Sequence, residues 1–251
     1  MSAALYLSRR GHKVTLAEKE DHWGGQFTFA WQAPGKERMK ETLDSLVRAV
    51  QESDASIQTR KTLDASLVKA IQPDLLVWAV GAVQNIPEIS GLKDQHVLTS
   101  LEYFHNQKAV RGPRVLVIGA GRVGLEIAEK LGQEGYHVVA TKRTDPIGSA
   151  MEMITRTLIL KRIAGLENVV LMPHTTVKAF MAERVDAEQD GVGLSLLPFN
   201  TVILASGLLP AAGPGEEIRK LVPNIEIIGD ALEVLDIYSA THAGYQLALK
   251  Y

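Results

Sequence analysis

The chain has 251 residues, of which 46% are hydrophobic and 22% are charged, and its formal net charge is −2. This composition suits one large globular domain or two smaller interleaved ones, and the weak negative charge argues against a nucleic-acid partner. There is no cysteine, so the chain itself can carry no redox-active disulfide, no cysteine-ligated iron–sulfur cluster and no cysteine nucleophile.

Membrane and metal partners are not expected either. No apolar run reaches the roughly 18 residues that span a bilayer, and the N-terminus lacks the regions of a signal peptide. We therefore expect a soluble, cytoplasmic protein. The seven histidines are scattered without the spacing of metal ligands, so we expect no metal site.

The first residues predict the second half of a βαβ unit, with a helix over 3–11 and a strand over 12–17 that leads to Glu18. We expect the first strand and its glycine turn to lie upstream of Met1, unless that site is deleted, and so expect a fragment of a longer polypeptide. A carboxylate at the end of such a strand accepts hydrogen bonds from the ribose of an adenosine. The alternative for Glu18 is a surface acid beside Lys19 and Glu20.

The next segments predict one long helix and one buried strand. Apolar residues recur at helical spacing over 37–52, which indicates an amphipathic helix. The apolar run over 73–81 predicts a buried strand that ends at Gly81, and turn residues over 87–91 follow it. We expect a domain junction near residues 86–111, so that the next domain begins at residue 112.

A strand over 115–118 then leads directly into the three glycines of a dinucleotide-binding turn. In that motif, Gly119 allows a tight turn, Gly121 lets a pyrophosphate approach the backbone, and Gly124 brings the following helix close to the strand. The alternative is a glycine-rich turn that holds no ligand.

Basic residues follow the next strand, which is predicted over 136–141. NAD-binding folds place an acid there, about 20 residues after the glycines, but this chain has Lys142 and Arg143. A guanidinium and an ammonium suit a 2′-phosphate, so NADP is favoured over NAD. The negative charge of Asp145 argues against a 2′-phosphate at this place. The alternative interpretation is a solvated loop whose positive charges have no ligand.

The last third predicts a helix over 154–164, strands over 169–172, 177–182, 201–205 and 225–228, and a final helix over 239–251. A strand that ends in Ala-x-Gly occurs once in each half, at Gly81 and at Gly207, which indicates two related nucleotide-binding folds. Asp230 follows the strand over 225–228, where it is either a ligand of a cofactor or part of an Asx turn or helix cap.

These motifs occur in a familiar order: Glu18, Trp23-Gly24-Gly25-Gln26, Trp78-Ala79-Val80-Gly81, the turn at Gly119, Ala205-Ser206-Gly207 with Pro210, Ile228-Gly229-Asp230, and Ala240-Thr241-His242-Ala243-Gly244-Tyr245. Over nearly its whole length the chain resembles the C-terminal FAD/NAD(P) portion of the NADH:flavin oxidoreductases, the family of 2,4-dienoyl-CoA reductase and trimethylamine dehydrogenase.

The resemblance implies an α/β fold with two Rossmann-like dinucleotide-binding domains of the glutathione reductase type. An NAD(P) domain over 112–208 is then inserted into an FAD domain formed by residues 1–111 and 209–251. The implied partner is an N-terminal (β/α)₈ barrel with FMN and an iron–sulfur cluster, on the same or another chain; homo-oligomerisation stays open.

The function implied by the resemblance is transfer of a hydride from NAD(P)H to FAD, and of electrons onward to the partner domain. The alternative is a non-catalytic module that binds an adenine nucleotide. No side chain is expected to act as an acid or base, because the cofactors supply the chemistry. The expected cofactor-binding residues are Glu18, Lys19, Gly25, Gln26, Gly81, Gly119, Ala120, Gly121, Arg122, Val123, Gly124, Lys142, Arg143, Gly207, Gly229 and Asp230.

Overall fold

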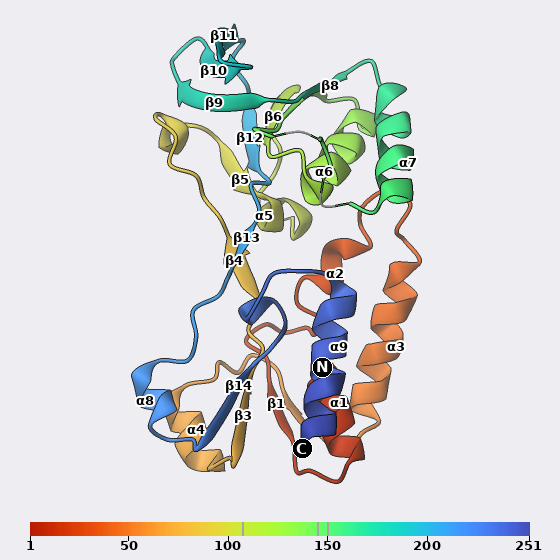
Figure 1. Ribbon diagram of the computed structural model, residues 1–251, viewed down its shortest axis with the longest axis vertical. Helices are drawn as coiled ribbons and strands as arrows, with labels where there is room; N and C mark the ends of the chain where they lie inside the picture. Colours follow the sequence, from red (N-terminus) through yellow and green to blue (C-terminus); the bar gives the residue numbers. More distant parts are fainter. Residues whose placement is uncertain (107, 145, 150) are drawn as a thin grey trace. The chain divides into compact units, whose positions relative to one another are not determined.

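The computed structural model describes residues 1–106, 108–144, 146–149 and 151–251, which form two compact units (Figure 1). The first unit contains Met1–Trp31, Lys36–Val83 and Leu208–Tyr251, and the second contains Gln32–Gly35 and Gln84–Gly207. Both units are α/β, as predicted. Among the described residues, no helix combines the length and apolar character needed to cross a membrane.

The second unit is built on a parallel five-stranded sheet. Its central strand β6 (Arg114–Ile118) is buried on both faces, with Val115, Leu116 and Val117 fully shielded from solvent. Such strands are continuously apolar because helices and other layers cover both faces of a parallel sheet. The order of strands is β5 (Val97–Thr99), β12 (Thr201–Leu204), β6, β7 (His137–Thr141) and β8 (Val169–Met172).

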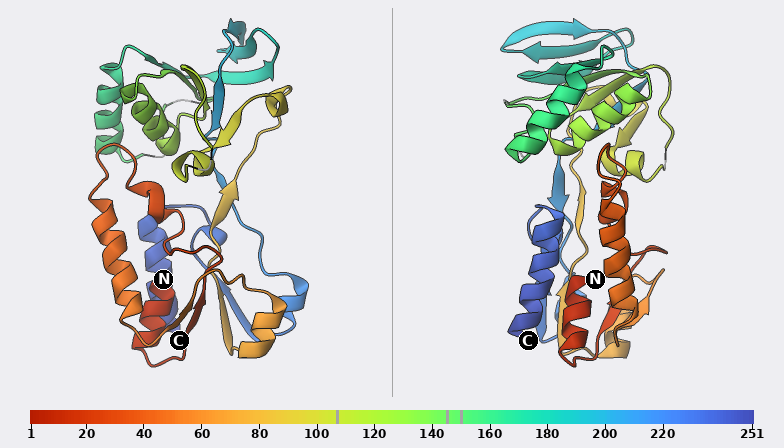
Figure 2. Two further views of the ribbon diagram at one scale, coloured as in Figure 1. Left: turned by 180° about the vertical axis from the view of Figure 1, so that it is seen from behind. Right: turned by 90° about the vertical axis from the view of Figure 1, so that its right-hand side faces the viewer.

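Helices provide the crossover connections that parallel strands require. Helix α6 (Arg122–Gln133) joins β6 to β7, and α7 (Met153–Ala164) joins β7 to β8. These two helices lie side by side (Figure 2), and α6 packs on the sheet. The short helix α5 (Ser100–Phe104) begins with a complete capping box at Thr99 and precedes β6.

A three-stranded antiparallel sheet also belongs to the second unit. It consists of β9 (Thr175–Phe180), β10 (Val185–Gln189) and β11 (Val192–Leu196). Val177, Phe180 and Val185 of this sheet pack with Leu116, Val202 and Leu204 of the parallel sheet. The strands over 185–196 were not predicted. Their hairpin turn, Asp190-Gly191, has positive φ at both residues, which is a known signal for such turns.

The first unit contains two separate pairs of parallel strands: β1 (Thr15–Ala17) with β2 (Ser56–Gln58), and β14 (Asn224–Ile227) with β3 (Leu75–Trp78). Its helices are α1 (Ser2–Arg9), α2 (Phe27–Ala30), α3 (Met39–Gln51), α4 (Ala65–Ile71), α8 (Glu216–Arg219) and α9 (Ile237–Lys250).

Helices cover both faces of the β14–β3 pair. On one face α1 and α9 pack with Val77 and Ile228, and Gly244 of α9 allows a close approach to the backbone of Ala3. On the other face α4 and α8 contribute Val68, Ile218 and part of a second core cluster. The alternation of apolar residues along these strands therefore supplies two helix-covered faces.

The longer segment of the second unit begins at Gln84, whereas the expected domain boundary is at residue 112. Residues 97–99 form β5, which pairs with β12 at the edge of the five-stranded sheet. The expected junction over 86–111 is therefore part of the second unit. The two segments that lead from one unit to the other, β4 (Ala82–Gln84) and β13 (Leu208–Pro210), pair with each other.

An ion pair between a buried carboxylate and an exposed guanidinium joins α6 to α7. Glu129 is fully buried, and its two carboxylate oxygens accept hydrogen bonds from Nε and Nη2 of Arg162 at 2.5 and 3.0 Å. The hydrogen bond to Glu129 raises the pKa of the Arg162 guanidinium. Removal of one member would leave the other without its partner, which is costly when that group is a buried carboxylate.

We predict that Arg162→Met lowers the free energy of unfolding by about 3 kcal/mol, since it leaves the buried Glu129 carboxylate without a counter-charge and with Gln133 as its hydrogen-bond donor. The double variant Glu129→Met/Arg162→Met should recover most of that loss. Urea unfolding of the single and double variants measures both values. The exposed pair Lys130–Glu134 on the same helix is the control, and Lys130→Met should cost less than about 1 kcal/mol. An equal loss for both pairs would contradict the prediction.

Candidate functional site

The glycine turn lies at the carboxyl end of β6, in the middle of the parallel sheet. From this strand the chain continues through α6 to β7 on one side, whereas β12 pairs with β6 on the other side. The point where connections leave a parallel sheet in opposite directions is the usual place of a ligand crevice. The strand order therefore places the turn where nucleotide-binding folds bind their ligand.

Two of the three glycines are required by packing inside the protein. Gly119 has φ +109°, and a Cβ there would lie 2.3 Å from the carbonyl oxygen of Ala205. A Cβ at Gly124 would lie only 1.8 Å from the carbonyl oxygen of Gly119. Thus Gly119 allows the turn to approach the end of β12, and Gly124 allows α6 to approach the turn.

Gly121 has a different environment. Its φ of −82° is accessible to any residue, and a Cβ there would meet no protein atom within 4 Å. It is the N-cap of α6, and no side chain caps that helix end. The first N–H groups of a helix have no partner within the helix, and the helix dipole favours an anion there. Open space beside uncapped N–H donors fits a pyrophosphate.

Other backbone groups of the turn are already engaged. The N–H groups of Gly119 and Ala120 both donate to the carbonyl oxygen of Thr141, at 3.0 and 2.9 Å. The carbonyl oxygen of Ala120 accepts a hydrogen bond from Gly148 N–H at 3.0 Å, and Ala120 is fully buried. The donors that a ligand would meet are therefore those at the start of α6, where Arg122 is half-buried and Val123 is exposed.

The basic residues and Gly207 lie at the ends of the neighbouring strands. Lys142 directly follows β7, where its N–H donates to Met172 and its carbonyl oxygen accepts from Thr175. The next residue, Arg143, is exposed, and Asp145 lies outside the described residues. Gly207 follows β12 with φ +95°, and its carbonyl oxygen accepts hydrogen bonds from the backbone of Asn85 and the side chain of Gln84.

Sequence reasoning did not single out two features of this site. Glu126 is a buried carboxylate on α6, five residues after Gly121. Gly148 contacts the glycine turn through Ala120 although 28 residues separate them, and the only local signal was the turn sequence Pro146-Ile147-Gly148.

In the first unit, Glu18 follows β1 as predicted. Its carboxylate accepts a hydrogen bond from Glu20 N–H at 3.0 Å, and its own backbone pairs with Gln58 and Lys61. Lys19 is largely exposed and forms an ion pair with Glu20. These contacts anchor the turn after β1 and leave the side chain of Glu18 half-exposed.

The loop after Glu18 contains a buried donor without a hydrogen-bond partner among the described residues, the indole Nε1 of Trp23. Gly24 is packed against Leu43 of α3, but a Cβ at Gly25 would meet nothing within 4 Å. Gln26 is the half-buried N-cap of α2. A buried donor without a partner calls for a hydrogen-bond acceptor, and a flavin nucleotide carries such acceptors.

Gly81 and Gly229 follow the adjacent strands β3 and β14, which are parallel, so both lie at the same end of that pair. Each has positive φ. The Oδ1 atom of Asp230 accepts a hydrogen bond from Leu235 N–H at 3.3 Å, whereas α9 is capped by Asp236. Asp230 therefore stabilises a turn but is not the cap of the last helix.

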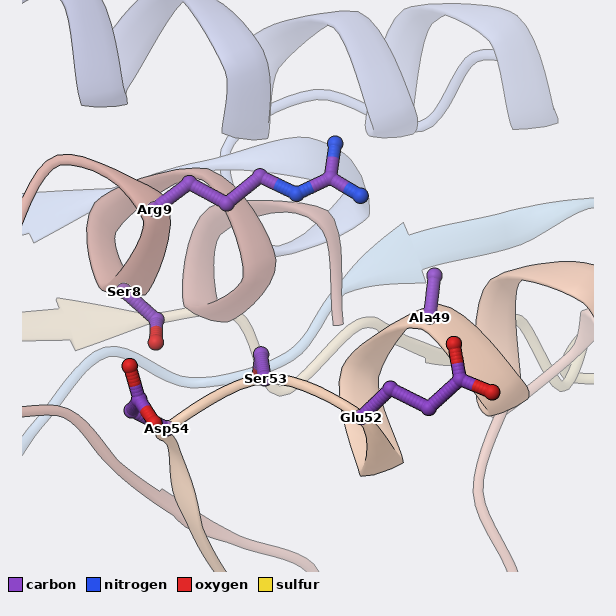
Figure 3. Close-up of a pocket in the computed structure, with 6 residues that line it drawn as sticks. All are labelled: Ser8, Arg9, Ala49, Glu52, Ser53 and Asp54. Carbon is purple, nitrogen blue, oxygen red and sulfur yellow. The ribbon is translucent and has the colours of Figure 1, made fainter.

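A small cavity in the first unit lies away from these residues. It is lined by Ser8 and Arg9 at the end of α1 and by residues 49 and 52–54 around the end of α3 (Figure 3). Figure 3 shows the Arg9 side chain extending away from Asp54. None of the expected cofactor-binding residues lines it, and among the described residues no cluster of three potential metal ligands occurs.

Comparison with known proteins identifies the family. Residues 1–222 match the model of the pyridine nucleotide-disulphide oxidoreductases. The chain belongs to this oxidoreductase family. Because this chain contains no cysteine, a disulfide reductase mechanism cannot operate on this chain alone.

Individual relatives confirm the resemblance to flavin oxidoreductases. The chain is 32% identical over 249 residues to a bilirubin reductase of Mediterraneibacter gnavus (strain CC55_001C) and 28% identical over 255 residues to an NADH oxidase of Thermoanaerobacter brockii. Both matches include 99% of this chain, but only 38% and 39% of the two relatives.

Solved structures also match almost all of this chain with only part of their own length. A 2-naphthoyl-CoA reductase in complex with 2-naphthoyl-CoA matches with a TM-score of 0.92 at 23% identity, over 100% of this chain and 38% of that one. A histamine dehydrogenase from Rhizobium sp. 4-9 matches with a TM-score of 0.87 at 19% identity, over 98% of this chain and 41% of that one. This pyridine nucleotide-disulphide oxidoreductase fold is thus part of larger enzymes.

The environments of two glycines lead to a prediction on stability. Gly124→Ala should lower the free energy of unfolding by about 3 kcal/mol or more, because its Cβ would overlap the Gly119 carbonyl. Gly121→Ala should change it by less than about 1 kcal/mol, because its Cβ enters open space. Thermal and urea unfolding test both variants, and an equal loss would show that Gly121 is also packed within the protein.

Proposed function

We propose that this chain is the nucleotide- and flavin-binding portion of a longer NADPH-dependent flavin oxidoreductase. The observation that carries the proposal is the open space at Gly121, between two glycines that are fully packed. When bound, NADPH supplies a hydride and FAD accepts it. The second unit is the NAD(P) domain on this proposal, and it is inserted between the two parts of an FAD domain formed by the first unit.

In the second unit, the backbone at Gly121 and the start of α6 bind the pyrophosphate, while Gly119 and Gly124 shape the turn. Ala120, Arg122 and Val123 complete it. Lys142 and Arg143 bind the 2′-phosphate, since they follow the strand adjacent to β6 and carry the required positive charge. Gly207, at the end of β12, closes the other side of the crevice without a side chain.

In the first unit, Glu18 binds the ribose of the adenosine and Lys19 flanks it. Gly25 and Gln26 lie near the flavin, where the unsatisfied indole of Trp23 supplies a donor. Gly81, Gly229 and Asp230 contact the ribityl or pyrophosphate portion. Each of these residues follows a strand at its carboxyl end or lies in the loop after it, which is where α/β sheets bind ligands.

The partner on this proposal is a further domain of the longer protein, a (β/α)₈ barrel with FMN and an iron–sulfur cluster. Its support is that the named relatives are reductases or oxidases of which this chain spans only 38–39%. This chain contains no cysteine for a cluster of its own, so electrons that arrive at the flavin leave through groups on another domain.

The direct test is a titration of the purified chain with FAD, NADPH and NADH in parallel by calorimetry, after a visible spectrum that detects co-purified flavin. Binding of FAD and NADPH, with NADPH-dependent bleaching of the flavin under anaerobic conditions, would support the proposal. Binding of a nucleotide without FAD would instead favour a non-catalytic nucleotide-binding module. Binding of neither would overturn both.

The 2′-phosphate role of Arg143 gives a selective prediction. Arg143→Ala should weaken NADPH binding by about 1.5 to 3 kcal/mol, the scale of a charge-assisted hydrogen bond, with little change for NADH. Calorimetry with both nucleotides measures the difference. Lys161→Ala, which removes an exposed charge on α7, is the control. Equal losses for NADPH and NADH would refute the role of Arg143.

Substitution of Gly121 should weaken the binding of both nucleotides, whereas substitution of Arg143 should weaken the binding of NADPH alone. The methyl-bearing variant Gly121→Ala would fill the space that we assign to the pyrophosphate, which NADPH and NADH share. We therefore predict that both nucleotides bind more weakly by a similar amount, about 1 to 2 kcal/mol. The same calorimetric series measures it, and unchanged binding of both nucleotides would place the pyrophosphate elsewhere.

A further inference from the structure

The described residues that follow β7, 142–144 and 146–149, are attached to the rest of the second unit at both ends of this segment. At its start, the backbone of Lys142 bonds to Met172 and Thr175. At its end, Gly148 N–H donates to the carbonyl oxygen of Ala120 in the glycine turn, at 3.0 Å. The exposed residue Arg143 lies between these attachments. The segment is therefore connected to the glycine turn through backbone contacts as well as through the sheet.

A side chain reinforces the second attachment. Nε of Arg156, on α7, donates to the carbonyl oxygen of Ile147 at 2.6 Å. Ile147 and Met151 are buried at this point, and Gly148 has φ +69°. A Cβ at Gly148 would lie 3.0 Å from Leu125 and 3.4 Å from Cγ of Arg156, so the Arg156 stem packs close to the backbone of the segment.

Arg156 lies in the first turn of a helix with a capped N-terminus. Glu152 caps α7 by accepting hydrogen bonds from the N–H groups of Ile154 and Thr155, both at 3.0 Å. The N–H of Arg156 donates to the carbonyl oxygen of Glu152 at 2.9 Å, so Arg156 is in the first turns of a capped helix. Its half-buried guanidinium therefore has a rigid base from which it holds Ile147.

We infer that Arg156 is a positioning residue for nucleotide choice: it fixes the segment that carries Arg143 against the glycine turn. The inference rests on the proposed binding of NADPH at this turn. Arg156 acts through Ile147 and Gly148, and Arg143 is the residue that would meet the 2′-phosphate. A segment that is ordered before binding loses less backbone entropy when it binds, so it binds its ligand more tightly.

The inference separates the two nucleotides, because only NADPH has a group that Arg143 would contact. Disorder in the segment should weaken NADPH binding more than NADH binding, because NADH depends on the glycine turn but not on Arg143. A residue that merely stabilised the fold would instead affect both nucleotides equally or only the unfolding transition. The ratio of the two dissociation constants is therefore the informative quantity.

The test compares Arg156→Met, which keeps the length of the stem but loses the donor, with Arg156→Lys, which keeps a donor. We expect Arg156→Met to weaken NADPH binding by up to about tenfold, the limit set by loss of the charge-assisted hydrogen bond from Arg156 to Ile147, and NADH binding by less than about twofold. Arg156→Lys should restore most of the affinity for NADPH. Hydrogen exchange at the Gly148 amide should be faster in Arg156→Met than in the unaltered chain.

Lys161→Met on the same helix is the matched control, because Lys161 is exposed, and it should change neither nucleotide. An unchanged ratio of NADPH to NADH affinity in Arg156→Met, with the unaltered chain binding both, would overturn the role of Arg156 alone. A failure of the unaltered chain to bind NADPH or NADH would overturn the proposed function, and the inference with it. Thermal unfolding of each variant verifies that it is folded.

Discussion

The second unit depends on one close approach of backbone segments, at the carboxyl end of β6. The carbonyl oxygen of Gly119 lies where a Cβ of Gly124 would be, and the carbonyl oxygen of Ala205 lies where a Cβ of Gly119 would be. This contact brings the end of β12, the glycine turn and the start of α6 together. Because α6 starts there, its N-terminal N–H groups lie at the carboxyl end of the central strand, which is where such sheets bind ligands.

The same contact explains why three glycines serve two different needs. Gly119 and Gly124 are required by the protein itself, and any side chain at either would separate the helix from the strand. Gly121 is not required by backbone conformation or by packing, so its lack of a side chain leaves open space beside the start of α6 for a ligand. The structure therefore distinguishes the two glycines that packing requires from the glycine that is available for binding, which the sequence motif alone does not.

The spacing of apolar residues along the sequence was sufficient to predict most of the long helices and buried strands. The helices α1, α3, α6, α7 and α9 and the buried strands β3, β6, β7 and β12 follow from apolar spacing and turn residues alone. Periodicity was insufficient for β10 and β11, in which polar residues alternate with apolar ones and no continuous apolar run occurs, although Asp190-Gly191 marks their turn. The boundary at residue 84 depends on pairing of β5 with β12, about a hundred residues away, which no local pattern contains.

Long-range contacts also account for what was missed at the site. The bonds from Gly148 to Ala120 and from Arg156 to Ile147 depend on how α7 packs, and the unsatisfied indole of Trp23 is visible only once the loop is folded. The two units also differ in how complete their sheets are. Two-stranded sheets are marginal alone, whereas five parallel strands with covered faces support a stable core. The second unit, which we propose binds NADPH, is therefore the more self-sufficient scaffold, and the first unit, which we propose binds the flavin, has strand pairs with fewer partners.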